Sequence, residues 1–216
     1  MTLRVLFLAE GTSDSGLIRQ IERIAVEAHV DIAVTHPDLA RLPKPPGPGV
    51  AAKLRAVLEI DGSYDLLLIH RDADRDGRDA RIAEIFDAVD RNAPGTPHTA
   101  IIPVRMTEAW LLVDEAEIRV VAGNPNGKVK IDLPAVSRVE SIPDPKSLLK
   151  EKLALASGLT GRKLQKFNQR FPQNRRLLLE RIDPDGPIAK VPSWCAFVTD
   201  LKAGLWHATG SQDRAR

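Results

Sequence analysis

Four short apolar runs, separated by segments of helical periodicity, constrain the fold of this chain more than any other feature. The runs are RVLFLAE (residues 4–10), VDIAVTH (30–36), YDLLLIH (64–70) and HTAIIPVRM (98–106). Runs with little polar interruption are typical of parallel strands that are buried on both faces. The segments between them carry apolar side chains three and four residues apart, which indicates helices. The alternating order predicts an α/β fold in which a parallel sheet has helices on both faces.

The pattern changes to helices after residue 106. TEAWLLVDEAEIRVVAG (107–123) predicts one helix that ends at a glycine, and PKSLLKEKLALASG (145–158) and NRRLLLERI (174–182) predict further helices. No strong strand pattern follows residue 136. We therefore predict an α/β domain over residues 1–123 and a mainly helical C-terminal extension over residues 124–216 that packs on it.

The composition narrows the class of protein. The chain has 216 residues, of which 43% are hydrophobic and 28% charged, and its formal net charge is +2. This balance neither requires nor excludes a nucleic-acid partner, so the local distribution of charge has to decide. The single cysteine, Cys195, excludes an intramolecular disulfide and favours a reducing cytoplasm. Because no apolar stretch approaches the roughly 20 residues that span a bilayer, we expect a cytoplasmic protein without a membrane partner.

Acidic side chains follow two of the four apolar runs. Glu10 and Gly11 come after the first run, and Asp72 and Asp74 come after the third. Ligands bind beyond the carboxyl ends of the strands in an open parallel sheet, so these side chains are expected at the binding edge. If the third strand continues to residue 74, Asp72 and Asp74 point to the same side. Gly11 would let a ligand approach the backbone closely.

Carboxylates gathered at one edge repel one another unless a cation neutralises them. Hard divalent ions prefer oxygen ligands, and we therefore expect Glu10, Asp72 and Asp74 to bind Mg²⁺ or Mn²⁺. The alternative is a solvated loop in which the interspersed arginines pair with the aspartates and no metal is bound.

Three motifs carry a resemblance to a known family. LFLAEGTSD (6–14) and LLLIHRDAD (66–74), each an apolar strand with an acidic end, resemble the TOPRIM domain of topoisomerases, DnaG-type primases, recombination proteins and OLD-family nucleases. IPVRMTEAWLLVD (102–114) resembles a small TOPRIM-like family of uncharacterised bacterial proteins that is discussed alongside defence and restriction systems. The resemblance covers residues 4–114 and, more loosely, the remainder, where DPK (144–146) and PSWCAF (192–197) are similar to later landmarks of that family.

The resemblance implies a TOPRIM/Rossmann-like sheet and a set of catalytic acids. Glu10 would be a general acid/base or a metal ligand, Asp72 and Asp74 metal ligands, and Glu108 a further catalytic acid. Neither a topoisomerase tyrosine context nor primase zinc-binding cysteines are visible, which leaves a Mg²⁺- or Mn²⁺-dependent nuclease with a role in bacterial defence. The alternative is a non-catalytic or conditionally active metal-binding subunit that works with a separately encoded ATPase. Three arginines at the same edge are suited to bind the flanking phosphates: Arg71, Arg75 and Arg105.

A basic segment in the second half offers a second contact with nucleic acid. RKLQKFNQRFPQNRR (162–176) contains no acid, and Phe167 and Phe171 interrupt its cations. Cations with aromatic side chains suit contacts with a nucleic-acid backbone and its bases. The alternative is an ordinary helix-core pair of phenylalanines beneath a solvated basic face. The candidate nucleic-acid-binding residues are Arg162, Lys163, Lys166, Arg170, Arg175 and Arg176.

Overall fold

The computed structural model describes residues 2–213, with side chains up to residue 210, and forms two compact units. The sheet unit comprises Met1–Thr12, Ile21–Ile102 and Ala196–Arg216, and the helical unit comprises Ser13–Gln20 and Pro103–Cys195. Both units are assembled from separate stretches of chain. The domain boundary that we predicted after residue 123 stays a prediction.

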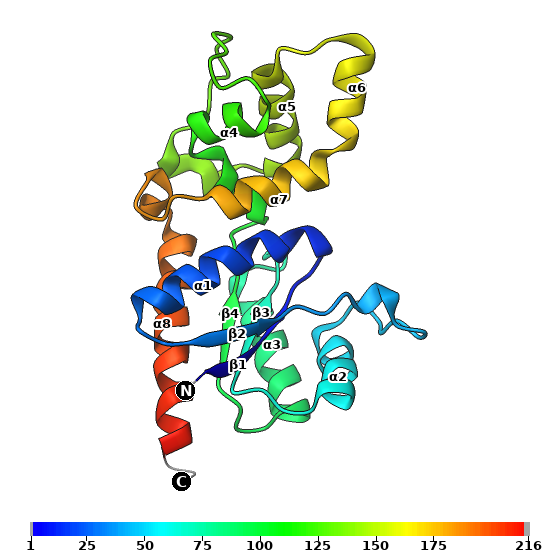
Figure 1. Ribbon diagram of the computed structural model, residues 1–216, viewed down its shortest axis with the longest axis vertical. Coiled ribbons are helices and arrows are strands. Elements are labelled where there is room, and N and C mark those ends of the chain that lie inside the picture. Colours follow the sequence, from blue (N-terminus) through cyan, green and yellow to red (C-terminus); the bar gives the residue numbers. More distant parts are fainter. Residues whose placement is uncertain (1, 214–216) are drawn as a thin grey trace. The chain divides into compact units, whose positions relative to one another are not determined.

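A four-stranded parallel sheet forms the centre of the sheet unit (Figure 1). The strands are β1 (Leu3–Leu8), β2 (Ile32–Thr35), β3 (Leu66–His70) and β4 (His98–Ile101), in the order β2-β1-β3-β4. Every residue of β3 is buried, as expected of a strand covered on both faces. The predicted α/β fold with a parallel sheet is thus confirmed.

The strands are shorter than the apolar runs that predicted them. β4 ends at Ile101 although its run continues to residue 106, and Pro103 has no backbone N–H to donate to a neighbouring strand. β3 ends at His70, so Asp72 and Asp74 lie in the loop beyond the strand. An apolar run indicates which residues are buried. The strand itself ends where hydrogen bonding to the neighbouring strands stops, so the two need not have the same length.

Helices cover both faces of the sheet. Those with residues in the sheet unit are α1 (Ile18–Glu27), α2 (Val50–Asp61), α3 (Arg78–Asn92) and α8 (Pro192–Asp213), together with the short 3-10 helix η2 (Leu39–Arg41). On one face, α2 and α3 bury apolar side chains against alternate residues of the central strands. The shared cluster includes Leu6, Leu8, Leu54, Val57, Leu67, Ile69, Ile85 and Val89.

The opposite face is covered by α1 and α8. Thr99 of β4 pairs with Leu68 of β3, whose neighbours Leu67 and Ile69 point to the α2 and α3 face, so Thr99 points to the other. Gly204 of α8 lies against Thr99 so closely that an added Cβ would come within 2.3 Å of the threonine Oγ1. Lys202 of α8 pairs with Glu27 of α1 at 3.3 Å, which places the two helices on the same face.

The described residues of the helical unit form helices joined by loops. Its elements are η1 (Thr12–Leu17), η3 (Thr107–Leu112), α4 (Glu115–Val121), η4 (Val136–Ser141), α5 (Pro145–Ser157), α6 (Gly161–Gln169), α7 (Phe171–Arg181) and η5 (Pro187–Lys190). The rings of Trp110 and Trp194 meet edge to face with centroids 5.2 Å apart, and both side chains are buried. The indole N–H of Trp110 donates to Ser193 Oγ at 2.8 Å, which satisfies its polar atom inside the core.

Our prediction of one continuous helix over residues 107–123 is wrong. The segment forms η3 and then α4, and the two are separated at Val113 and Asp114. The Asp114 carboxylate accepts a hydrogen bond from the backbone N–H of Glu117 at 3.1 Å and so caps a new helix. None of the helices within residues 2–213 is both long enough and apolar enough to cross a membrane.

Candidate active site

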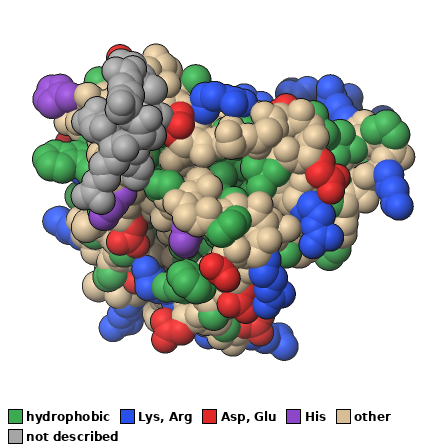
Figure 2. All heavy atoms as spheres, turned by 90° about the horizontal axis from the view of Figure 1, so that it is seen from below, with side chains coloured by type: hydrophobic (Ala, Val, Ile, Leu, Met, Phe, Trp, Pro, Cys, Tyr) green, Lys and Arg blue, Asp and Glu red, His purple; other side chains and the backbone are tan. Residues whose placement is uncertain are grey.

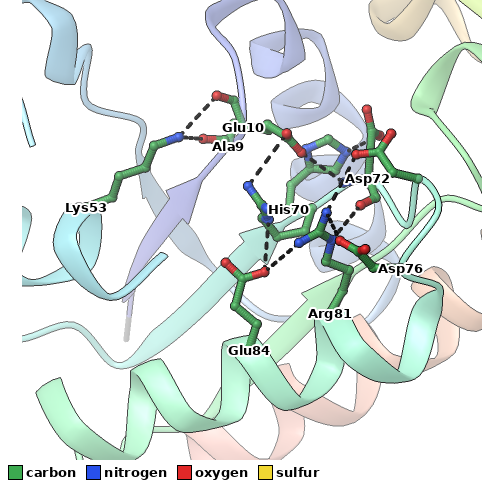
Figure 3. Close-up of polar contacts among 10 residues, drawn as sticks. Ala9, Glu10, Lys53, His70, Asp72, Asp76, Arg81 and Glu84 are labelled. Carbon is green, nitrogen blue, oxygen red and sulfur yellow. Dashed lines mark hydrogen bonds and ion pairs between the residues drawn. The ribbon is translucent and has the colours of Figure 1, made fainter. Parts of the chain in front are cut away.

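The candidate site lies at the carboxyl ends of β1 and β3. Leu8 of β1 is paired with Ile69 of β3, so the residues that follow these strands emerge side by side. Glu10 follows β1, and its Oε2 accepts a hydrogen bond from the backbone N–H of Asp72 at 3.0 Å (Figure 3). The structure therefore brings together two of the predicted acids, which are 62 residues apart in the sequence.

His70 contacts the side-chain carboxylate of Asp72. It is the last residue of β3, its side chain is fully buried, and its Nε2 lies 3.6 Å from Asp72 Oδ1. A buried ring next to a half-buried carboxylate restricts the rotamers of that carboxylate. His70 is thus suited to orient Asp72 towards the strand ends (Figure 3).

Asp74 is not positioned by strand alternation, as we had expected it to be. The strand alternation that would have aligned it with Asp72 is absent, because β3 ends at His70 and Asp74 has a left-handed backbone with φ of 48°. Its Oδ2 lies 3.7 Å from Arg81 Nη2. Asp74 is consequently placed by a turn and an ion pair, and its role as a metal ligand stays a prediction.

Arg71 and Arg81 form ion pairs with the acidic side chains at the strand ends. Arg71 Nη1 lies 3.6 Å from Glu10 Oε1, and its Nε lies 3.4 Å from Glu84 Oε2. Arg81 lies 2.9 Å from Asp76 and 3.0 Å from Glu84, and its Nε donates to the carbonyl of Asp72 at 3.1 Å. Our alternative to a metal site was a solvated loop in which arginines pair with the aspartates. Such ion pairs are present at the strand ends.

The acids around Arg81 raise its pKa. Burial lowers the pKa of Arg81, but its hydrogen bond to Glu84 and the charges of Asp76, Glu84 and Asp74 raise it further than burial lowers it. The net result is a pKa above the ordinary value of arginine. Arg81 therefore remains a fixed positive charge beside the acids at every ordinary pH.

A crevice opens next to Glu10, beyond the carboxyl ends of the neighbouring strands β1 and β2. Its volume is about 250 Å³. It is lined by Leu8, Ala9, Glu10, Gly11, Thr12, His36, Pro37, Asp38, Leu39, Ala40, Pro45, Pro46 and Lys53. Lys53 Nζ donates to the carbonyls of Ala9 at 3.3 Å and Glu10 at 3.1 Å, which holds the end of β1 in place. Gly11 lines the crevice, where we expected a ligand to approach.

Glu108 and Arg175 are paired inside the helical unit. Arg175 Nε donates to Glu108 Oε1 at 3.0 Å, its Nη2 lies 2.6 Å from Asp14 Oδ1, and its Nη1 donates to Ser13 Oγ at 2.7 Å. Glu108 is 3% exposed and Arg175 is 6% exposed. We therefore leave Arg175 out of any surface for nucleic acid, because its guanidinium is buried among protein acceptors.

The remaining predicted cations are more accessible. Arg105 belongs to the helical unit, is half-buried and has a left-handed backbone with φ of 64°, and Arg75 is exposed in the sheet unit. The basic segment forms α6 and α7, and Arg176 pairs there with Glu180 at 2.7 Å. Its exposed cations are Arg162, Lys163, Lys166, Arg170 and Arg176.

The prediction that Glu10, Asp72 and Asp74 hold a divalent ion stays a prediction. In the part of the chain that the structure describes, no three His, Cys, Asp or Glu side chains are gathered closely enough to hold a metal. Mg²⁺, however, is usually bound by one or two carboxylates, with water and phosphate completing its shell. The backbone N–H of Asp72 lies 3.0 Å from a carboxylate oxygen of Glu10, so these two residues are the ones at the strand ends that could hold such an ion.

The sequence patterns did not indicate Lys53 and Glu84. Lys53 lies in the first turns of α2, Glu84 lies two turns into α3, and each helix begins after a loop that follows a strand. A weak signal was available, because helices that follow parallel strands begin at the edge where the strands end. Which of their polar residues turn inwards depends on how each helix packs, and one sequence does not show that.

Comparison with protein-family models, with curated proteins and with solved structures finds no match for this chain. The fold thus defines the class: an α/β protein built on a four-stranded parallel sheet, with an acidic cluster beyond β1 and β3. The TOPRIM resemblance of the motifs stays a prediction.

Proposed function

We propose that the chain is a metal-dependent nuclease that hydrolyses phosphodiester bonds of nucleic acid at the strand ends of the sheet unit. The observation that carries this proposal is the contact between Glu10 and Asp72, at 3.0 Å from carboxylate oxygen to backbone nitrogen. Two acids from neighbouring strands meet at the edge where parallel sheets bind ligands. The crevice beside Glu10 offers room for a phosphate and its neighbouring atoms.

Glu10 and Asp72 would hold Mg²⁺ or Mn²⁺, with Asp74 within the same loop. A bound ion would supply an activated water and offset the charge that develops on the phosphate. His70 orients Asp72, and Lys53 holds the backbone of Glu10. Arg71 contacts Glu10 and Glu84 only at the length of weak ion pairs, so it can turn to bind a phosphate oxygen.

Cleavage assays with Mn²⁺ or Mg²⁺ test this assignment. Glu10→Gln and Asp72→Asn keep the size of the side chain and remove its charge, so each is expected to lower the rate on the order of 100-fold or more. Asp87→Asn is the matched control, because Asp87 is an exposed acid on α3 that pairs with Arg91 at 3.4 Å. Full activity in both site variants would refute the proposal.

A second candidate function is favoured by the ion pairs of Arg71 and Arg81. These arginines already neutralise the acids, so a conditionally active subunit would need a partner to release them. The partner implied by the resemblance is a separately encoded ATPase. This candidate predicts that the chain alone binds Mn²⁺ without cleaving, and that it cleaves when the ATPase is added; cleavage by the chain alone contradicts it.

A further inference from the structure

A second concave site lies entirely within the helical unit, between α5, α6 and α7. Its volume is about 300 Å³, which falls within the range of small-molecule sites. Its lining residues are Lys150, Glu151, Leu153 and Ala154 of α5, Phe167 and Asn168 of α6, and Phe171 and Asn174 of α7. We call it the α5–α7 cavity.

Two phenylalanines and a lysine form one part of the α5–α7 cavity. Phe167 is half-buried near the end of α6, and Phe171 is buried at the start of α7. Lys150 Nζ lies 5.0 Å from the centre of the Phe171 ring. The combination presents flat apolar surface next to a positive charge, which suits a flat ring that carries an anionic group.

Asn174 adds a polar group to the same cavity. It is 93% buried, and within the described residues its Nδ2 has no hydrogen-bond partner. A buried N–H donor without an acceptor lowers stability, and a ligand that brings an acceptor would satisfy it. Glu151 also lines the cavity, but it pairs with Lys152 at 3.0 Å, so its negative charge is balanced within the protein.

The surface of α6 adds positive charge close to this cavity. Every residue of α6 except Leu164 and Phe167 is exposed. Three of those exposed residues, together with the residue that follows the helix, are cations: Arg162, Lys163, Lys166 and Arg170. A nucleic-acid backbone is the extended anion that such a row of cations binds, and bases are the flat rings with hydrogen-bond acceptors that it carries.

We infer that the α5–α7 cavity binds a nucleobase of a single-stranded nucleic acid. The base stacks on Phe167, an acceptor on its edge receives the Nδ2 hydrogen of Asn174, and the adjoining phosphate lies by Lys150. Single strands are favoured because the bases of a duplex are already stacked and paired. This inference rests on the proposed function in that nucleic acid is the ligand of both sites.

Fluorescence anisotropy with a labelled oligothymidylate tests this binding at low salt, in the presence of EDTA so that no cleavage occurs. The wild-type chain is expected to bind the oligonucleotide on the order of tenfold more tightly than an abasic strand of equal length. Phe167→Ala and Asn174→Ala should remove most of that preference. Leu177→Ala is the matched control, because Leu177 is an apolar residue on α7 that is 45% exposed and does not line the cavity.

A crosslinking measurement covers the case in which a cavity variant does not fold. An oligonucleotide with 5-iodouracil, irradiated with the wild-type chain, is expected to crosslink to the peptide that contains Phe167 and Phe171. Equal affinity for thymidylate and abasic strands, or crosslinks confined to other peptides, would overturn the inference.

The two proposals can fail independently. Glu10→Gln leaves the α5–α7 cavity intact, so its base preference in EDTA should equal that of the wild-type chain. Base-dependent binding without any Mn²⁺-dependent cleavage would leave the cavity assigned and refute the nuclease acting alone. Cleavage without base-dependent binding would refute the cavity and leave the nuclease standing.

Discussion

The acidic residues of this chain differ in where their carboxylates lie. Glu10 and Asp72 meet at the strand ends, whereas Glu108 is buried against Arg175 in the helical unit. The sequence indicates that Glu10 and Asp72 should converge, because strand order places the ends of β1 and β3 together. The sequence does not show that Arg175, 67 residues away from Glu108, pairs with it.

Arg175 is predicted to be a structural residue. Its guanidinium joins the buried carboxylates of Asp14 and Glu108, so Arg175→Met removes the cation that pairs with both of them. We expect the free energy of unfolding to fall by about 3–5 kcal/mol, measured by urea denaturation.

The neighbouring arginine provides the control for this prediction. Arg176 is exposed and pairs with Glu180, so Arg176→Met should change the free energy of unfolding by less than about 1 kcal/mol. An Arg175→Met protein that is as stable as Arg176→Met, but binds nucleic acid less tightly than the wild type, would show that Arg175 is a surface contact.

The sequence predicted the type of these helices and strands but not the residues at which they end. All four apolar runs contain a strand, and the helices at 145–158 and 174–182 were recognisable from their spacing. The end of β3 at His70 was not predictable, because the charges that follow do not show where pairing with β1 and β4 stops. The break between η3 and α4 was hidden because Asp114 can either cap a helix or lie on the polar face of one.

The start of α5 makes a pH-dependent prediction. The Asp144 carboxylate accepts a hydrogen bond from the backbone N–H of Ser147 at 2.9 Å. This bond, then the Ser147 side chain and then the charges of Lys150 and Lys146, hold the pKa of Asp144 below its ordinary value of 3.8. A lowered folded-state pKa means that the charged cap stabilises the fold above pH 3.8, and that this is lost as the pH falls through the folded-state pKa.

Thermal unfolding at several pH values tests the Asp144 cap. Asp144→Ala is expected to lower the melting temperature at neutral pH, and the difference from the wild type should shrink as the pH falls below 3.8. Asp144→Asn keeps the acceptor without the charge, so it should lose less than the alanine variant. A difference that is independent of pH would show that the carboxylate charge does not stabilise α5.

At the scale of the whole molecule, charge alone does not locate the site. The formal net charge is +2, and on the face shown in Figure 2 lysine and arginine side chains are interspersed with aspartate and glutamate. The groups to which we assign a function are instead local: the acids beyond β1 and β3 in the sheet unit and the α5–α7 cavity in the helical unit. The first could be predicted from strand order. The second could not, because it combines residues of three helices and a buried amide without a partner among the described residues.

Binding of Mn²⁺ to the full chain, measured by isothermal titration calorimetry, tests the central claim most directly. If Glu10 and Asp72 together hold a divalent ion, the wild-type chain and Asp87→Asn should bind Mn²⁺ with equal affinity. Glu10→Gln and Asp72→Asn should each bind it at least about tenfold more weakly. Equal affinity in all four proteins, or no saturable binding to the wild-type chain, would contradict the claim that these two carboxylates form a metal site.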